Sequence, residues 1–438
     1  MGLELGTFEI KDAVLGSRTE LNAGVLSINA GELRAKLLEE GDFEDVEVEI
    51  IRPNEEVRLI HVIDAVEPRL RVSEPGSDFP GMLGPPRRVG RGRTHRLNGV
   101  VVTEVAPPVP GEPTYWREAI VDMAGEGAKY SPLSGLINVV LSFRPKQEKS
   151  ATAGESLENV FEGTSEAGEY NHAIRIAGLK AAVYLAEVTR GQQPDRVDVY
   201  DLDHADHGKL PKVIYFYQMK SPYVYGEVAP SGGAIGRGAH LPTLIHPNEI
   251  LDGAIVNYSC MTACMREVTY LLQNHALIHE LYAHHGKDLD FMGVVLYTNG
   301  DSVWTKERIS SYAANLAVTL GADGAILMCH GGGHPFVDVM MTCQKLEQDG
   351  VKTTLLLMEM AANPEDSGFV HYVREADAIV STGNYEQMID LAPMAKVCGG
   401  SEILETGDKA SGPLNMPLRR MLGSTHQFGG SYLQGQMD

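Results

Sequence analysis

Short runs with alternating apolar and polar residues characterise the first 145 residues of the chain. Residues 46–50 (VEVEI) alternate aliphatic residues with glutamate, which is the period-two pattern of a half-buried strand. Three further stretches repeat this theme: residues 57–63, 98–105 and 136–143. Breaks rich in proline and glycine, such as residues 79–86, separate them. Residues 1–145 are therefore predicted to form a β-rich N-terminal domain.

From residue 289 onward, strand-like runs alternate with helix-like runs. Four apolar runs are typical of buried strands: residues 291–297, 325–328, 352–358 and 378–381. Three runs between them predict helices: residues 306–320, 335–348 and 368–375. Gly321 follows the first of these, and glycine commonly ends a helix. The alternation predicts βαβ units, and so a doubly wound, mostly parallel α/β domain over residues 289–400.

A mixed segment, residues 146–288, connects the two predicted domains. Residues 146–169 are polar and predict an exposed linker. Apolar residues at helical spacing predict a helix over residues 171–189, and residues 213–217 predict a short strand. A C-terminal tail, residues 401–438, follows the α/β domain. The predicted fold class is thus α/β, with a β-rich first part and a doubly wound second part.

Size and charge narrow the classes of function. A chain of 438 residues is too long for one ordinary core, so two or three domains are expected. The 37 basic and 59 acidic residues give a net charge of −22, which repels nucleic-acid phosphates and anionic lipid. We therefore expect neither nucleic acid nor a membrane as a partner.

Targeting signals and the cysteine count bear on the cellular location. No apolar run reaches the ~18 residues that a membrane-spanning helix needs. The N-terminal residues lack the basic head and apolar core of a signal peptide. Five cysteines are an odd number spread over a long chain, which does not suggest a disulfide framework. A reducing cytoplasm is the expected location.

A glycine-rich loop, residues 329–335 (CHGGGHP), lies between a predicted strand and a predicted helix. Backbone N–H groups at such a helix N-terminus can hold an anion. The loop is neither a GxGxxG nor a Walker sequence, so we expect no nucleotide. The simpler interpretation is that the glycines are needed for a tight turn.

Two histidine-containing groups are candidate metal ligands. The first is a run of donors between Pro194 and Pro211: Asp201, Asp203, His204, Asp206 and His207. A solvated loop explains this run more simply, because acidic residues are common in turns. The second group lies near a predicted helix end: His275, His279, His284 and His285. These histidines are expected to be capping or surface groups, so no metal is predicted.

Cysteine positions suggest one reactive thiol. Cys329, Cys343 and Cys398 fall in strand and helix patterns and are assigned to packing. Cys260 and Cys264 are four residues apart, but no second pair completes a zinc site. Cys260 follows a strand-like segment that runs into small polar residues, where a thiolate can attack the carbonyl of Ser259 if the turn is strained. Spacing alone favours a buried, inert thiol.

Seven segments resemble the component B proproteins of the clostridial glycine, sarcosine and betaine reductases. They are residues 66–69 (VEPR), 79–81 (FPG), 92–95 (GRTH), 176–180 (IAGLK), 252–256 (DGAIV), 281–287 (LYAHHGK) and 377–384 (DAIVSTGN). The segments occur in order and span nearly the whole chain up to about residue 400. The sequence is therefore similar to this family along most of its length.

The resemblance implies that the chain cleaves itself between Ser259 and Cys260, giving fragments 1–259 and 260–438. In the implied reaction, the Cys260 thiol attacks the Ser259 carbonyl and converts the amide to a thioester. Elimination across the Cα–Cβ bond of Cys260 breaks the chain and leaves a dehydroalanine, which hydrolyses to a ketone with loss of ammonia. A pyruvoyl group, covalently derived from Cys260, is then the only expected cofactor.

The resemblance also implies an oxidoreductase that works only within a multi-subunit complex. The pyruvoyl group would form a Schiff base with a substrate amine and withdraw electrons from its C–N bond. A selenocysteine-bearing component B subunit would then attack the α-carbon, and the component A selenoprotein and component C would complete the reductive cleavage. Betaine is a quaternary amine and cannot form a Schiff base, so the substrate stays open among glycine, sarcosine, betaine and other amines.

Two alternatives remain. Ser259 stands where the family usually has asparagine, which favours an uncleaved binding or scaffold homologue without pyruvoyl chemistry. The other alternative is a metal-dependent hydrolase that uses Asp201, Asp203, His204 and His207.

Overall fold

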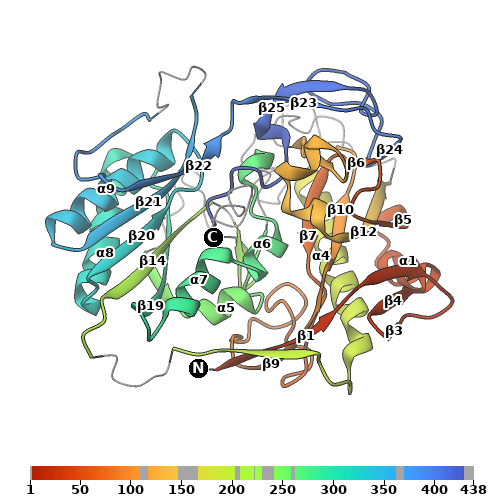
Figure 1. Ribbon diagram of the computed structural model, residues 1–438, viewed down its shortest axis with the longest axis horizontal. Coiled ribbons are helices and arrows are strands. Elements are labelled where there is room, and N and C mark those ends of the chain that lie inside the picture. Colours follow the sequence, from red (N-terminus) through yellow and green to blue (C-terminus); the bar gives the residue numbers. More distant parts are fainter. Residues whose placement is uncertain are drawn as a thin grey trace.

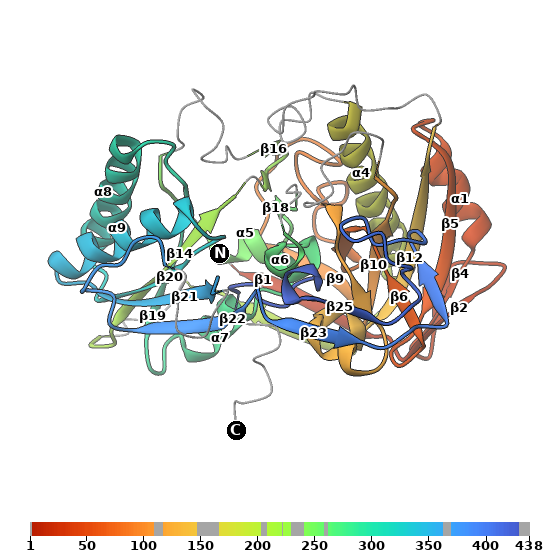
Figure 2. The same ribbon diagram turned by 90° about the horizontal axis from the view of Figure 1, so that it is seen from above.

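The fold has two sheet-containing halves with a group of short helices between them (Figure 1). The computed structural model describes residues 2–108, 117–146, 166–202, 208–220, 222–228, 241–257, 262–361 and 369–428. Figure 2 places α8 (Val303–Leu320) and α9 (His334–Gln348) at one end of the molecule, and α1 (Ala30–Leu38) with β2 (Asp12–Leu15) and β4 (Val25–Ile28) at the other.

Two four-stranded sheets form most of the N-terminal half. The first has the order β13 (Arg196–Tyr200), β1 (Leu3–Glu9), β9 (Gly92–Asn98) and β8 (Arg69–Arg71). The second has the order β5 (Phe43–Ile51), β12 (Ile137–Pro145), β10 (Val100–Val105) and β7 (Val62–Val66). This half also holds β2 (Asp12–Leu15), β3 (Glu20–Asn22), β4 (Val25–Ile28) and α1 (Ala30–Leu38). The described part of residues 1–145 is thus rich in strands.

A long helix, α4 (Glu166–Ala186), packs on this half. Its residues Tyr170, Ile174 and Leu185 belong to the same buried core as Phe43 and Val139 of the second sheet. The predicted helix over residues 171–189 is confirmed, with Glu187–Thr189 forming a 3-10 helix at its end. Its apolar spacing therefore marked the face that the sheet buries.

Two predicted strands are each divided into two shorter ones. Residues 57–63 form β6 (Val57–Leu59) and the start of β7, because His61 has a φ of 55° that a strand cannot accommodate. Residues 98–105 span the end of β9 and the whole of β10, and Gly99 turns the chain between them with a φ of 92°.

The C-terminal half is built on a six-stranded sheet. Its order is β17 (Thr243–Ile245), β19 (Asp290–Thr298), β14 (Lys212–Met219), β20 (Gly324–Met328), β21 (Lys352–Glu359) and β22 (Ile379–Asn384). All neighbouring strands are parallel except β17, which runs antiparallel at one edge. The sheet is not confined to residues 289–400, since β17 and the central strand β14 come from earlier in the chain.

Helices cover both faces of this sheet. On one face, Ile214 and Phe216 of β14 share a core with α8 (Val303–Leu320) and α9 (His334–Gln348). On the other, Tyr215 and Tyr217 share a core with α7 (Ala276–His284) and with strands of the N-terminal half. The α/β class is therefore confirmed, as is Gly321 in the left-handed conformation after α8.

The helix predicted over residues 368–375 is wrong for the part that the structure describes. Residues 369–375 form bends and a turn. Phe369, Val373 and Ala376 do pack against the α9 side of the sheet, at the spacing of a helical face. Val370 and Tyr372, however, are 62% and 57% exposed. The apolar pattern correctly indicated which of these side chains are buried. The backbone that carries them, however, is not helical.

Short elements connect the two halves. They are β15 (Tyr223–Val224), β16 (Glu227–Val228), β18 (Ile255–Val256), α5 (Pro247–Leu251) and α6 (Thr269–Gln273). β11 (Val121–Asp122), β6 and β24 (Lys396–Cys398) form a small sheet, and β23 (Met388–Leu391) pairs with β25 (Leu414–Pro417). In this way residues 388–417 return to the N-terminal half.

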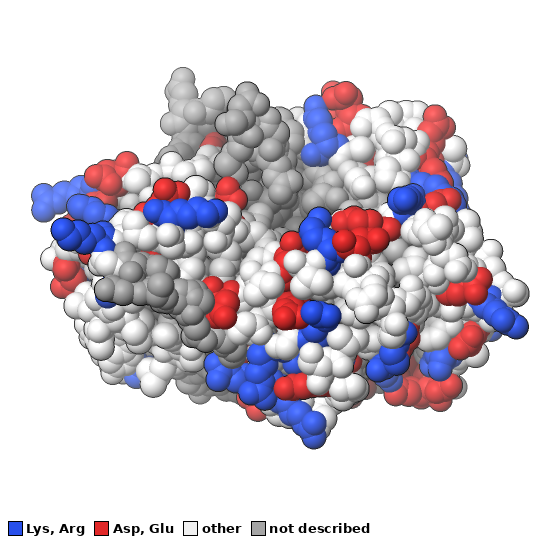
Figure 3. Space-filling model, turned by 60° about the horizontal axis from the view of Figure 1, so that its bottom comes forward, with Lys and Arg blue, Asp and Glu red and all other residues white. Residues whose placement is uncertain are grey.

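The surface and the helices add two observations. Figure 3 shows acidic and basic side chains interspersed over one face of the molecule. None of the helices in the described part of the chain is both long enough and apolar enough to span a bilayer.

Candidate functional site

Ser259 and Cys260, the predicted cleavage site, lie outside the described residues. The nearest described residues on either side, Asn257 and Thr262, are both buried, with 1% and 2% exposure. The Asn257 backbone N–H donates to Oγ1 of Thr269 (3.1 Å), and its side-chain amide donates to the Ile63 carbonyl (3.1 Å). Both approaches to the predicted site are thus built into the interior.

Two buried carboxyl groups lie behind Asn257. Asp64 accepts hydrogen bonds from the backbone N–H (2.7 Å) and from Oγ1 (2.6 Å) of Thr269, the residue that holds Asn257. Burial raises the pKa of Asp64 to about 6. Burial, followed by the nearby charge of Asp64, raises the pKa of Glu104 well above its usual value. Asp64, a carboxyl group with a raised pKa, therefore lies one hydrogen-bonded residue away from Asn257.

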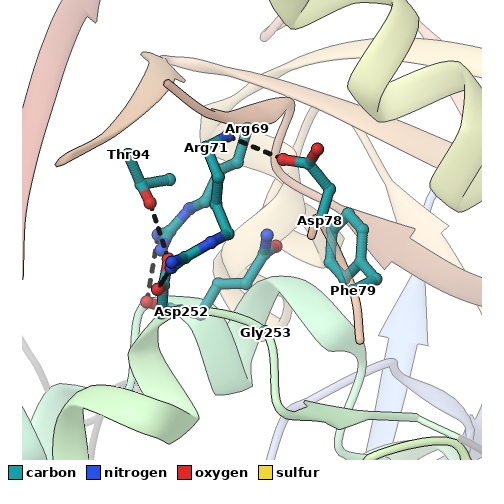
Figure 4. Close-up of a pocket in the computed structure, with 8 residues that line it drawn as sticks. Arg69, Arg71, Asp78, Phe79, Thr94, Asp252 and Gly253 are labelled. Atoms are coloured by element: carbon teal, nitrogen blue, oxygen red, sulfur yellow. Dashed lines mark hydrogen bonds and ion pairs between the residues drawn. The ribbon is translucent and has the colours of Figure 1, made fainter. Parts of the chain in front are cut away.

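A small pocket marks where four of the family-like segments meet. Its lining includes Arg69 of the VEPR segment, Phe79 of FPG, Thr94 of GRTH, and Asp252 and Gly253 of DGAIV (Figure 4). The pocket has room for about one water molecule, which is too little for an amino-acid substrate. We interpret it as a structural junction that fixes the chain leading into β18.

Ion pairs and hydrogen bonds satisfy the charges at this junction. Asp252 forms an ion pair with Arg71 and accepts hydrogen bonds from Thr94 Oγ1 (2.7 Å) and the Gly90 N–H (2.7 Å). Arg69 is paired with Glu67 at 2.6 Å. Figure 4 shows the Arg71 guanidinium directed toward Asp252. Each buried charge therefore has a partner, which is the condition under which buried charges are tolerated.

A second arrangement lies at the carboxyl ends of β14 and β20. The chain leaves β14 for β19 on one side and later crosses to β20 on the other, so the strand order reverses between β14 and β20. In open α/β sheets, ligands bind in the crevice outside the strands at such a point. Residues that follow these two strands, Lys220 and residues 329–333, are therefore candidate binding residues.

Lys220 follows the last residue of β14 and is partly buried. Its Nζ lies 3.8 Å from the position that a Cβ on Gly331 would occupy, and the Met265 sulfur lies 3.7 Å from the same point. Burial lowers the pKa of Lys220, and the neighbouring Cys329 partly offsets this effect. Among the described residues, no carboxylate forms an ion pair with this ammonium group.

His330 is fully buried in the adjoining loop. Its Nδ1 lies 2.8 Å from Oε1 of Glu267, a close contact whose angles do not meet those of a hydrogen bond. Nε2 of His330 has no hydrogen-bond partner in the described part of the structure. The other oxygen of Glu267 accepts a hydrogen bond from Tyr217 (2.7 Å). The Gln218 side chain accepts from the His330 N–H (2.9 Å) and so ties the loop to β14.

The histidines near α7 differ from the prediction. His275 is buried, and its Nε2 lies 3.2 Å from the Tyr215 hydroxyl of β14. Burial lowers its pKa well below the usual value, and that of His279 to about 4. The surface-or-cap interpretation is thus wrong for His275, which packs against β14. It holds for His284, which is exposed beside Asp288.

Space and backbone angles explain the three glycines of residues 329–335. Gly331 and Gly333 have φ values of 103° and 68°. A Cβ on Gly332 would lie 1.5 Å from the Met360 sulfur. The simpler interpretation, a tight turn between β20 and α9, accounts for these residues.

The remaining candidates from the sequence are the predicted metal ligands and the three cysteines assigned to packing. Asp203, His204, Asp206 and His207 lie outside the described residues. Among those that are described, no three histidine, cysteine or acidic side chains are grouped to hold a metal ion. Cys329, Cys343 and Cys398 are buried as predicted, and burial raises the pKa of each thiol.

Lys220 and Glu267 were missed in the sequence. The rule that drew attention to residues 329–335, that loops after parallel strands line sites, applies equally to Lys220 after the 213–217 strand. Glu267 carries no comparable signal, because only the fold brings it to His330.

Comparisons with known proteins agree with the resemblance. The family profile "Glycine/sarcosine/betaine reductase component B subunits" matches residues 1–430. The chain is 34% identical to the "Glycine reductase complex component B subunits alpha and beta" of Peptoclostridium acidaminophilum, with 100% of both sequences covered. It is also 34% identical to the "Sarcosine reductase complex component B subunit alpha" of that organism, with 93% of this chain and 91% of the relative covered.

A third relative, the "Betaine reductase complex component B subunit alpha" of the same organism, is 34% identical over 96% of both chains. No solved structure matches the chain significantly. The match to the family profile over residues 1–430 and these full-length identities agree with the seven segments found in the sequence. The chain therefore belongs to the glycine/sarcosine/betaine reductase component B family.

Proposed function

We propose that this chain is the precursor of the substrate-binding subunit of a glycine/sarcosine/betaine-type reductase and cleaves itself between Ser259 and Cys260. The carbonyl that replaces the Cys260 thiol and amine supplies an electrophile for the substrate amine. The protein then acts in reductive C–N cleavage of glycine or an N-methylated derivative, as one component of a cytoplasmic complex.

One observation carries the cleavage proposal. The name of the glycine reductase relative assigns two subunits, alpha and beta, to one sequence that this chain matches from end to end. A single polypeptide that is cut once gives two subunits in this way. The proposed position of the cut, before Cys260, is the one that the resemblance implies.

The surroundings of the bracketing residues support a built reaction site. Asn257 is held through Thr269 by the buried Asp64, and Ala263 and Cys264 accept backbone hydrogen bonds from Gly423 and Thr425 (2.9 Å each). Self-cleavage requires that the thiol and the scissile carbonyl meet in a fixed geometry. The described residues on both sides of the proposed cut are thus anchored, which supports the proposal.

The substrate class and partners follow from the relatives. Their names refer to glycine, sarcosine and betaine, and each is named as a component of a reductase complex. No selenocysteine occurs in this chain, so a selenocysteine-bearing component B subunit, with components A and C, would complete the reaction.

Variants at two neighbouring cysteines test the proposal. Cys260→Ala removes the nucleophile, so denaturing electrophoresis should show one full-length band where the wild type shows two. Cys264→Ala is the matched control, since Cys264 is buried and burial raises its pKa to about 12. The control should be cleaved like the wild type, and its smaller fragment should react with hydrazine or borohydride.

The second candidate is an uncleaved scaffold homologue, which the serine at position 259 favours. It predicts one band for the wild type and no carbonyl reactivity. Ser259→Asn separates the two further: restored cleavage in this variant, with none in the wild type, would support the scaffold function for the natural chain.

A further inference from the structure

Two lysines lie at the carboxyl edge of the six-stranded sheet and differ in one respect. Lys306 is buried, and its Nζ forms a 2.6 Å ion pair with Asp338 and a 2.6 Å hydrogen bond to the Gly300 carbonyl. Lys220 follows the last residue of the central strand β14 and has no carboxylate partner among the described residues. A partly buried ammonium group without a counter-charge costs stability, and such an unpaired charge is a candidate for ligand binding.

The surroundings of Lys220 fit a small anion. The position that a Cβ on Gly331 would occupy lies 3.8 Å from the Lys220 Nζ, and the thiol of the neighbouring Cys329 has a pKa that burial raises well above the usual value. The buried His330 in the same loop has a ring nitrogen with no partner among the described residues. The unpaired cation and the unpaired ring nitrogen thus belong to the two segments that leave β14 and β20, at the point where α/β sheets bind ligands.

The substrates named for the relatives narrow the anion. Glycine, sarcosine and betaine differ at the nitrogen and share a carboxylate on one methylene carbon. A subsite common to such substrates must recognise the shared carboxylate. Met265, five residues after Cys260 in the sequence, also reaches this loop, since its sulfur lies 3.7 Å from the position of a Cβ on Gly331.

We propose that Lys220 binds the carboxylate of the amino-acid substrate at the carboxyl ends of β14 and β20, where the loop that follows β20 also carries His330. The inference rests on the proposed function, because it takes the substrate from that function. It adds a residue that determines specificity. The ammonium group of Lys220, directly after the central strand, selects amino acids over simple amines.

Protection of the carbonyl from phenylhydrazine tests the proposal. Phenylhydrazine condenses with a ketone with loss of water, and the adduct is read in the intact mass of fragment 260–438. At least one of glycine, sarcosine and betaine should slow labelling of the wild type at a lower concentration than its amide does. Lys220→Met should raise the half-protecting concentration of that acid about 10- to 100-fold, the value of a hydrogen bond to a charged group.

Lys212→Met is the matched control, because Lys212 is exposed at the opposite end of the same strand. It should leave protection by the acid unchanged, and protection by the amide should be similar in both variants and the wild type. Equal protection of the wild type and Lys220→Met by the acid would overturn the inference.

If Lys220→Met yields no fragment 260–438, the wild type alone still tests for a carboxylate subsite. Equal protection by an acid and its amide would exclude a carboxylate subsite, and so would protection by none of the three acids. If the wild type carries no reactive carbonyl, the proposed function fails as well. That result differs from an inference that fails alone, in which labelling occurs and the charge at position 220 has no effect.

Discussion

The junction around Asp252 and the region around Lys220 differ in whether their charged side chains have partners. At the junction, Arg71, Arg69 and Asp252 each meet an opposite charge or several hydrogen bonds. After β14 and β20, Lys220 and Nε2 of His330 have no such partner among the described residues. Paired charges hold a fold together, whereas an unpaired charge raises the cost of folding and lowers the cost of binding a ligand. The comparison assigns the first region to structure and the second to function.

Removing one partner at the junction should produce the largest effect. Arg71→Met leaves the Asp252 carboxylate buried without its ion pair, so the free energy of unfolding should fall by about 3–5 kcal/mol in urea titrations. Arg91→Met is the control, since Arg91 forms a mainly exposed pair with Glu74 and should change stability by less than about 1 kcal/mol. Similar losses in both variants would remove the distinction between this junction and ordinary surface pairs.

Lys306 provides the same test inside the α/β half. Lys306→Met leaves Asp338 buried and unpaired, so a loss of about 3–5 kcal/mol is expected in the same titration. Lys306 and Lys220 lie at the same edge of one sheet. The loss of stability in Lys306→Met is therefore the reference for the same substitution at the unpaired Lys220. A free energy of unfolding equal to that of the wild type in Lys306→Met would show that the ion pair at this edge does not stabilise the fold.

Asp64 extends the comparison to the approach of residue 257. Its pKa is raised from 3.8 to about 6, so the folded protein binds the proton more tightly than the unfolded chain does. The resulting stability is present below about pH 4 and is lost as the pH rises through about 6. The wild type should lose up to about 3 kcal/mol over this range, and Asp64→Asn should not.

The matched control for this pH profile is Asp408→Asn on the exposed surface. Chemical denaturation between pH 4 and pH 7 should give the wild-type slope for the control and a flatter slope for Asp64→Asn. Parallel profiles for all three proteins would contradict a carboxyl group that titrates in the interior.

Lys220→Met should have the smallest effect on stability. The substitution removes an unpaired charge and keeps an apolar stem, so the free energy of unfolding should change by less than about 1 kcal/mol or increase. A loss as large as that of Lys306→Met would indicate that Lys220 is a structural cation. Thermal unfolding of the two variants side by side makes the comparison.

The sequence predicted the C-terminal sheet well because its strands and helices have a single buried pattern each. Strands β19, β20 and β21 and helices α8 and α9 all lie where apolar runs indicated. The N-terminal half was harder, since its strands are short and positive φ values at His61 and Gly99 interrupt the runs. The capping pattern of Asn29 and Glu32 was available to reveal α1.

The candidate functional residues also differ in how far the sequence alone could reveal them. Cys260 came from resemblance, because one thiol in a polar stretch carries no distinctive spacing. The junction requires residues 69, 79, 94 and 252 to meet, and no local pattern links positions so far apart. The similarity of those segments to the family had no physical explanation until the fold brought them together. Gly178 is another example, since a Cβ there would lie 1.7 Å from the Glu104 carboxylate.

The mass of the freshly purified wild-type protein tests the central claim most directly. Self-cleavage predicts two polypeptides, residues 1–259 and 260–438, and the second should begin with a carbonyl in place of the cysteine amine and thiol. A single species of 47.6 kDa with an intact thiol at position 260 would contradict the account.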